Sequence, residues 1–322
     1  MASKKGLAWQ QEVFGYLEGI TSRRIAERQA AAERAAADHS RPDHPALEPE
    51  RVGEVEAADS YLAAALVSSG VGELDERLGG GFLPGLWMIV GQPGTDKRAF
   101  LESVAWEAVA HHQAVVYYAL TEGAEAVRQR LLGILAFIVA EEADRTPDDH
   151  TERRSDSERS ADLDLAVWPA VLSRLWIVDS LPGGPEPVGV FLRSLERTLG
   201  NVASRVGHVP VVLIDDLETL LRGLDVKSAM GAARVITGLD GALVRCTAAG
   251  LMAALPTLTT LLPPSEEAKT NGLFQLGHGL IELLSRSPVR LDITIHENPH
   301  AAWRGTLPLV LHSSLGMFTP AA

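Results

Sequence analysis

The chain has 322 residues, of which 46% are hydrophobic, so it can bury a sizeable core as one large domain or as one domain with appendages. Its formal net charge of −13 argues against a generally basic nucleic-acid-binding protein, although net charge says nothing about a local basic channel. The single cysteine, Cys246, excludes an internal disulfide and predicts a reducing, cytoplasmic setting, and no apolar run is long enough to predict a membrane span.

The first part of the chain predicts a helical arm and a linker, together covering residues 1–60. Residues 7–38 favour a helix, because apolar residues recur at helical spacing and strong helix formers follow them. The apolar stripe consists of Trp9, Val13, Leu17 and Ile20. Such a helix needs a partner surface, so we expect it to bind a second copy or another protein. Three prolines among charged residues indicate the linker at 39–59.

An apolar strand, a Gly/Pro turn and an amphipathic run follow one another between residues 86 and 108. This order predicts a strand, a phosphate-binding loop and a helix, as in the pattern G-x-x-x-x-G-K-[ST]. The candidate nucleotide-binding residues are Gly91, Pro93, Gly94, Asp96, Lys97 and Arg98. Asp96 stands where the pattern has its second glycine, and Arg98 stands where it has Ser or Thr.

These two differences predict an impaired nucleotide site. Asp96 brings a carboxylate and a Cβ to a place where phosphate and backbone approach closely, and Arg98 lacks the hydroxyl that holds Mg²⁺. The segment could be a buried strand-turn-helix without a ligand, or it could still bind ATP, ADP or another anion without ordinary Mg²⁺ coordination. We expect Asp96 to pair with Lys97, Arg98 or another cation and to have a lowered pKa; the alternative is that Asp96 points into solvent.

Predicted strands and helices alternate after this loop. Strands are expected at 114–120, 175–178, 209–214 and 250–255, helices at 124–142, 188–202 and 229–247, and late strands at 280–285, 291–296, 307–312 and 317–318. The alternation predicts an α/β fold with a doubly wound, mainly parallel sheet. Residues 145–164 are dense in charged residues and serine, and predict a mobile surface insertion.

The order of these segments resembles the RecA-like core that DnaB-type replicative helicases share with KaiC-type ATPases. The similar segments are 70–81 (GVGELDERLGGG), the phosphate loop, the strand before Glu122, 175–183 (LWIVDSLPG), 211–220 (VVLIDDLETL), 271–286 (NGLFQLGHGLIELLSR) and 291–318. The later segments favour the DnaB type over the KaiC type. The resemblance covers about residues 67–318 and implies a RecA-like domain at 61–322.

The resemblance also implies roles for two acidic residues. Asp215 matches the residue that steadies Mg²⁺ through water, and Glu122 lies where the family has a catalytic glutamate, so it could orient water as a general base. Both residues could instead be structural. Asp215 could cap a turn at the end of a strand, and Glu122 could favour the start of a helix.

Other positions depart from the family pattern. The family's Ser-Gln sensor is replaced by the apolar residues 253–255, and its hairpin lysine and arginine match about Asn298 and His300, with Arg304 close by. These changes predict a non-hydrolysing pseudo-ATPase that serves as an assembly or regulatory component through protein contacts. Two alternatives stay open: a divergent ATPase associated with DNA, which the net charge does not support, and an inactive subunit that completes the site of an active homologue.

Overall fold

The computed structural model describes residues 66–145, 173–183, 186–256, 273–287, 289–298, 304–312 and 317–320. The predicted arm and linker, with the proposed interface residues Trp9, Val13, Leu17 and Ile20, therefore lie outside the described residues. The same holds for the predicted insertion at 145–164 beyond its first residue. The domain boundary at residue 61 stays a prediction.

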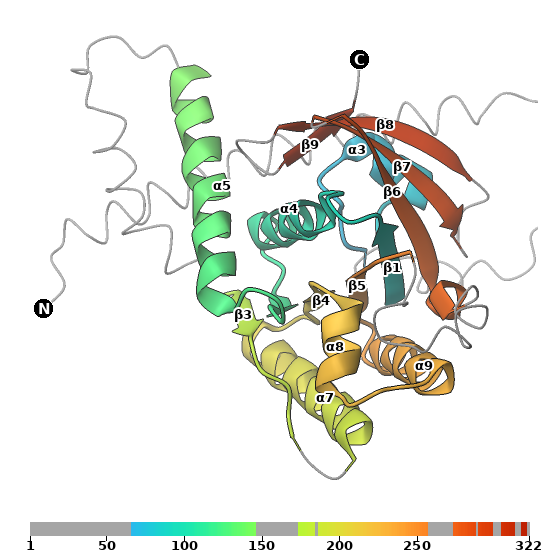
Figure 1. The fold of residues 1–322 in the computed structure, drawn as a ribbon. Helices are drawn as coiled ribbons and strands as arrows, with labels where there is room; N and C mark the ends of the chain where they lie inside the picture. Colours follow the sequence, from blue (N-terminus) through green and yellow to red (C-terminus); the bar gives the residue numbers. More distant parts are fainter. Residues whose placement is uncertain are drawn as a thin grey trace, which may run out of the picture.

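A nine-stranded sheet forms the centre of the fold, in the order β3-β2-β4-β5-β1-β6-β7-β8-β9 (Figure 1). The strands are β1 (Gly85–Gly91), β2 (Val115–Tyr118), β3 (Leu175–Val178), β4 (Val211–Ile214), β5 (Ala249–Ala254), β6 (Gly279–Ser287), β7 (Arg290–Glu297), β8 (Gly305–His312) and β9 (Met317–Pro320). All pairs from β3 to β6 are parallel, and the pairs from β6 to β9 are antiparallel. The predicted α/β fold with a mainly parallel sheet is confirmed.

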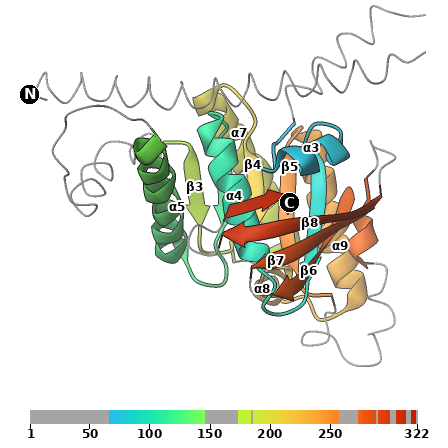
Figure 2. The same ribbon diagram turned by 90° about the horizontal axis from the view of Figure 1, so that it is seen from above.

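Helices cover both faces of the parallel part, as a view from above shows (Figure 2). One face carries α3 (Gly72–Leu78), α4 (Lys97–Ala110) and α5 (Ala124–Arg145), and the other carries α7 (Pro187–Val206), α8 (Leu217–Gly223) and α9 (Ala229–Arg245). A short 3₁₀ turn, η2 (Leu273–Leu276), packs beside α9. The sheet is therefore doubly wound. No helix among the described residues has the length and apolar content needed to cross a membrane.

Strand β1 contributes to both hydrophobic cores and so fixes the loop that follows it. Trp87 and Ile89 pack in the core beneath α4, and Leu86, Met88 and Val90 pack in the core beneath α9. Successive side chains of a strand point to opposite faces, so a strand covered on both faces needs a continuous apolar run. Each of these large side chains contributes about 1.5–3 kcal/mol by burial. The end of β1 is thus one of the best-anchored points of the fold.

Candidate nucleotide site

The predicted phosphate loop connects the end of β1 to the start of α4. It opens onto a pocket of about 300 Å³ at the edge where the parallel strands end. The pocket is lined by Gly94, Thr95, Asp96, Lys97, Arg98, Ala99, Thr121, Asp215 and Asp216. In open α/β sheets, ligands bind outside the carboxyl ends of the strands. The structure therefore brings the predicted loop residues together with the predicted metal-site residue Asp215.

The loop is closed by its own hydrogen bonds. The backbone N–H of Thr95 donates to the carbonyl of Gln92 (3.1 Å), and the N–H of Lys97 donates to the carbonyl of Thr95 (2.7 Å). Gly94 has a φ of 81°, and a Cβ at Gly91 would lie 2.4 Å from Thr95 Oγ1, so both glycines are required by this turn. Two of the N–H groups that a phosphate would need are therefore already used inside the loop.

The ammonium group of Lys97 turns back onto the same loop. Its Nζ donates to the carbonyls of Gly91 (2.6 Å) and Gln92 (2.9 Å) and to Thr95 Oγ1 (3.1 Å). Burial lowers the pKa of Lys97, the carboxylates of Asp216 and Asp96 oppose that change, and the neighbouring Arg98 adds to it. A phosphate entering this loop would have to draw Lys97 away from two backbone carbonyls.

The expectation that Asp96 forms an ion pair is wrong. Asp96 is exposed and has no ion-pair partner among the residues that the structure describes, because Lys97 contacts the loop carbonyls and Arg98 points elsewhere. Its pKa is raised rather than lowered, since partial burial by the loop outweighs the nearby charge of Lys97. Asp96 precedes α4 without accepting a capping hydrogen bond through its side chain. The alternative, a carboxylate that points into solvent, describes it.

Arg98 instead pairs with the predicted general base. Its Nη1 donates to Glu122 Oε1, and its Nη2 donates to Thr121 Oγ1 at 3.0 Å. On the other side of Glu122, Arg130 of α5 donates to Glu122 Oε2 through Nη1. The Nε of Arg130 donates to the buried Glu102 of α4 at 2.7 Å. Glu122 is thus held between two guanidinium groups, which link the loop after β2 to α4 and α5.

The two carboxylates of this network have opposite pKa shifts. Burial favours the neutral form of Glu122, but the hydrogen bond and charge of Arg130 and the charge of Arg98 outweigh it, so its pKa is lowered. Burial raises the pKa of Glu102 in spite of the hydrogen bond from Arg130. A carboxylate with a lowered pKa is a weaker proton acceptor, so this arrangement weakens Glu122 as a general base.

Asp215 lies at the end of β4, buried, and its oxygens are used within the protein. Oδ1 accepts from the N–H of Leu120 (3.0 Å), and Oδ2 accepts from the N–H and the hydroxyl of Thr121 (3.1 and 2.7 Å). The next residue, Asp216, caps α8 by accepting from the N–H of Thr219 (2.7 Å). Asp215 therefore holds the end of β2 against the end of β4, as the structural alternative predicted.

The residues present do not fit a Mg²⁺ ion. Position 98 carries a guanidinium instead of a hydroxyl, and Asp215 already accepts three hydrogen bonds. Within the described residues, no group of three or more His, Cys, Asp or Glu side chains could hold a metal ion. Mg²⁺ prefers several oxygen ligands in octahedral geometry, which this cluster does not supply.

The remaining predicted positions lie apart from this network. Ala253 and Ala254 are buried in β5, and Asn298 is buried and donates to the carbonyl of Arg77 (3.4 Å). Arg304 is exposed, and His300 lies outside the described residues. The sequence reasoning missed Glu102 and Arg130. Their helical spacing placed them on α4 and α5, but no local pattern connects two helices separated by a strand.

Comparisons with known proteins agree with this fold. No protein-family model matches the sequence, and no curated protein matches it. Among solved structures, the ATPase domain of a DnaB helicase matches with a TM-score of 0.60 and 16% identity, covering 85% of this chain and 100% of that one. A DnaB-like replicative helicase, in a structure that also describes its interactions with primase, matches with a TM-score of 0.60 and 16% identity, covering 99% and 76%.

A KaiC-like protein from the hyperthermophilic archaeon Pyrococcus horikoshii matches less well, with a TM-score of 0.50 and 13% identity over 80% of this chain and 99% of that one. The order of these similarities agrees with the sequence resemblance, which favours the DnaB type over the KaiC type. At such low identity a structural match shows the fold and leaves activity to be argued from the site. This chain has the RecA-like fold of the DnaB-type ATPase domains.

Proposed function

We propose that this protein is a degenerate RecA-like domain that does not hydrolyse ATP and serves as an assembly or regulatory component through protein contacts. One observation carries the proposal: Arg98, at the position of the Mg²⁺-binding hydroxyl, pairs with Glu122, at the position of the catalytic glutamate. One substitution thus removes a metal ligand and also binds the carboxylate that would activate water.

The rest of the site supports the same proposal. Asp96 adds a negative charge to a pocket that would have to accept a triphosphate, and like charges repel. Lys97 and two N–H groups of the loop are engaged within the loop itself. Each contact would have to break before a phosphate could bind as it does in an intact loop. Binding of ATP or ADP without ordinary Mg²⁺ coordination stays a prediction.

The proposed role in assembly rests on the predicted arm and on the neighbours' printed descriptions. One structural neighbour is a DnaB-like helicase described together with its interactions with primase. For this chain we propose a protein partner or a second copy, bound through Trp9, Val13, Leu17 and Ile20. A related candidate is an inactive subunit that completes an active homologue's site, for which the exposed Arg304 is the available cation.

Phosphate release from ATP by the full chain tests the proposal. With Mg²⁺, and with or without single-stranded DNA, we expect a rate no higher than that of a protein-free blank. The control variant is Lys97→Ala, which removes the ammonium group that every intact phosphate loop uses. Turnover on the order of 1 s⁻¹ that disappears in Lys97→Ala would contradict the proposal, because that value lies within the usual enzyme range.

A further inference from the structure

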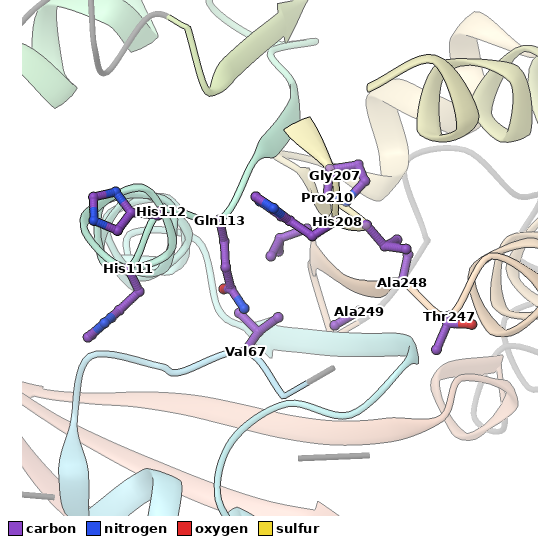
Figure 3. A pocket seen from close by; sticks show the side chains of 12 residues that line it. Val67, His111, His112, Gln113, Gly207, His208, Pro210, Thr247, Ala248 and Ala249 are labelled. Atoms are coloured by element: carbon purple, nitrogen blue, oxygen red, sulfur yellow. The ribbon is translucent and has the colours of Figure 1, made fainter. Parts of the chain in front are cut away.

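Two adjoining cavities lie at the opposite edge of the sheet, where the parallel strands begin. The first, of about 560 Å³, lies among the turns that lead into β2, β4 and β5 (Figure 3). The second, of about 730 Å³, adjoins it, because His112 and His208 line both. Neither cavity shares a lining residue with the phosphate-loop pocket. They are therefore separate from the candidate nucleotide site.

The first cavity is mainly apolar. Its apolar wall consists of Val67, Val209, Pro210, Val211, Ala248 and Ala249. Polar groups stand at its margin: in Figure 3, Gln113 and His208 come from two different turns and lie near Val67. The N–H of Ala114 donates to His208 Nε2 (3.1 Å), so the neutral ring carries its proton on Nδ1 and can donate there. Such a cavity suits an apolar or aromatic body.

The second cavity is basic. Arg174, at the start of β3, and Arg205, in the last turn of α7, line it together with Ser173, Trp176, Val206 and the two shared histidines. No acidic residue appears in its described lining, although the chain has 42 acidic and 29 basic residues. Among the described residues, no carboxylate lies within ion-pair distance of Arg174 or Arg205 (the ion pairs of α7 involve Arg193 and Glu196).

A bland explanation covers only part of this arrangement. A cation in the last turn of a helix complements the helix dipole, which accounts for Arg205. It does not account for Arg174, which comes from a strand, or for the absence of acidic residues from the lining. The helix ends themselves oppose an anion only weakly here, since turn N–H groups already bond carbonyls of the last turns, as Gly207 does to Ala203 (2.9 Å).

We propose that the two cavities form one binding site for a small organic anion. Its apolar or aromatic body lies in the first cavity, and its carboxylate, sulfonate or phosphate binds Arg174 and Arg205 in the second. Arginine suits this role because its planar fork matches such groups with two parallel hydrogen bonds. The volumes lie within the range of about 300–1,000 Å³ typical of small-molecule sites. Trp176 lies in the same lining and reports on occupancy through its fluorescence.

Binding of the fluorescent probe anilinonaphthalene sulfonate to the full chain tests this site. We expect the Arg174→Ala, Arg205→Ala double variant to bind the probe at least about tenfold more weakly. The matched control is Arg197→Ala with Arg234→Ala, which removes the same charge from exposed positions on α7 and α9. This control should bind within about twofold of the unaltered chain. The uncharged parent, phenylnaphthylamine, should not distinguish the two variants.

Competition and a conservative variant complete the test. Benzoate and phenyl phosphate in separate titrations show which anionic group the arginines prefer, and displacement by either one supports the site. If the double variant does not fold, the single variant Arg174→Lys keeps the charge without the fork and should bind the probe severalfold more weakly. Unchanged affinity in folded variants, or equal weakening in the control pair, would overturn the proposal.

Discussion

Arg98 has the largest effect on the candidate site, because it acts through both its identity and its position. It lacks the hydroxyl of an intact loop, and it reaches Glu122, 24 residues further along the chain. Asp96, the other altered residue, has a smaller effect, since it points into solvent and pairs with no described cation. The charge of Asp96 still opposes a phosphate, but Arg98 changes what the surrounding residues can do.

At this scale, the sequence predicted which residues line the pocket but not how they pair. The loop was recognisable because its glycines and lysine follow one another at fixed spacing. The contact between Arg98 and Glu122 depends on how β2 places its following loop beside α4. The bonds from Lys97 to its own loop depend on the backbone conformation at Gly91 and Gln92. Neither is encoded in a local pattern.

The two carboxylates that share Arg130 should contribute to stability with opposite dependence on pH. The folded-state pKa of Glu102 is raised, so the folded protein binds the extra proton and stability falls as pH rises above about 4.5. The folded-state pKa of Glu122 is lowered, so its contribution is present above about 4.5 and is lost as pH falls through the folded value.

Urea unfolding of Glu102→Gln and Glu122→Gln from pH 3 to pH 7 measures these contributions as differences from the unaltered chain. With rising pH, we expect the unaltered chain to lose stability relative to Glu102→Gln and to gain it relative to Glu122→Gln. Differences of the same sign in both variants would show that Arg130 does not hold the two groups as described.

Among the elements, the long ones were predicted well and the short ones were missed. The predicted helices at 188–202 and 229–247 correspond to α7 and α9, because their apolar residues recur over four or more turns. The seven-residue helices α3 and α8 were not predicted, since two turns are too few for a periodic pattern. Helix α8 begins instead at a capping residue, Asp216, which accepts from the N–H of Thr219.

Replacing this cap tests whether α8 depends on it. Asp216→Ala should lower the free energy of unfolding by about 0.5–2 kcal/mol, because it leaves an N–H at the start of the helix without its partner. Asp216→Asn should cost much less, since an asparagine oxygen caps a helix nearly as well and removes only the charge. Chemical denaturation measures both. Equal losses would assign the effect to the charge beside Lys97 rather than to the cap.

For the whole molecule, the alternation of strands and helices predicted a doubly wound sheet, and the structure confirms it. The order of strands was not predictable from this pattern, because it depends on which crossover each helix makes. The late strands were predicted individually, and they form an antiparallel extension from β6 to β9. The arm at 1–60 stays a prediction, since it lies outside the described residues.

Deleting residues 1–45 tests the arm. Four apolar side chains in one stripe could together contribute several kcal/mol to an interface, at about 1.5–3 kcal/mol each. We expect the deletion to lower the mass that light scattering measures, or to abolish binding of a protein partner. The substitution Trp9→Ala with Val13→Ala in the full chain is the matched control for chain length. An unchanged mass and unchanged binding in both variants would mean that the arm is no interface.

The central claim is that the residues of the phosphate loop have replaced a magnesium-nucleotide site with contacts among themselves. Calorimetric titration of ATP into the full chain, in Mg²⁺ and in a chelator at equal ionic strength, tests it most directly. Because Arg98 offers no ligand and Asp215 is already hydrogen-bonded, we predict the same heat in both solutions, whether ATP binds weakly or not at all. Affinity for ATP that rises about tenfold or more with Mg²⁺ would contradict the account.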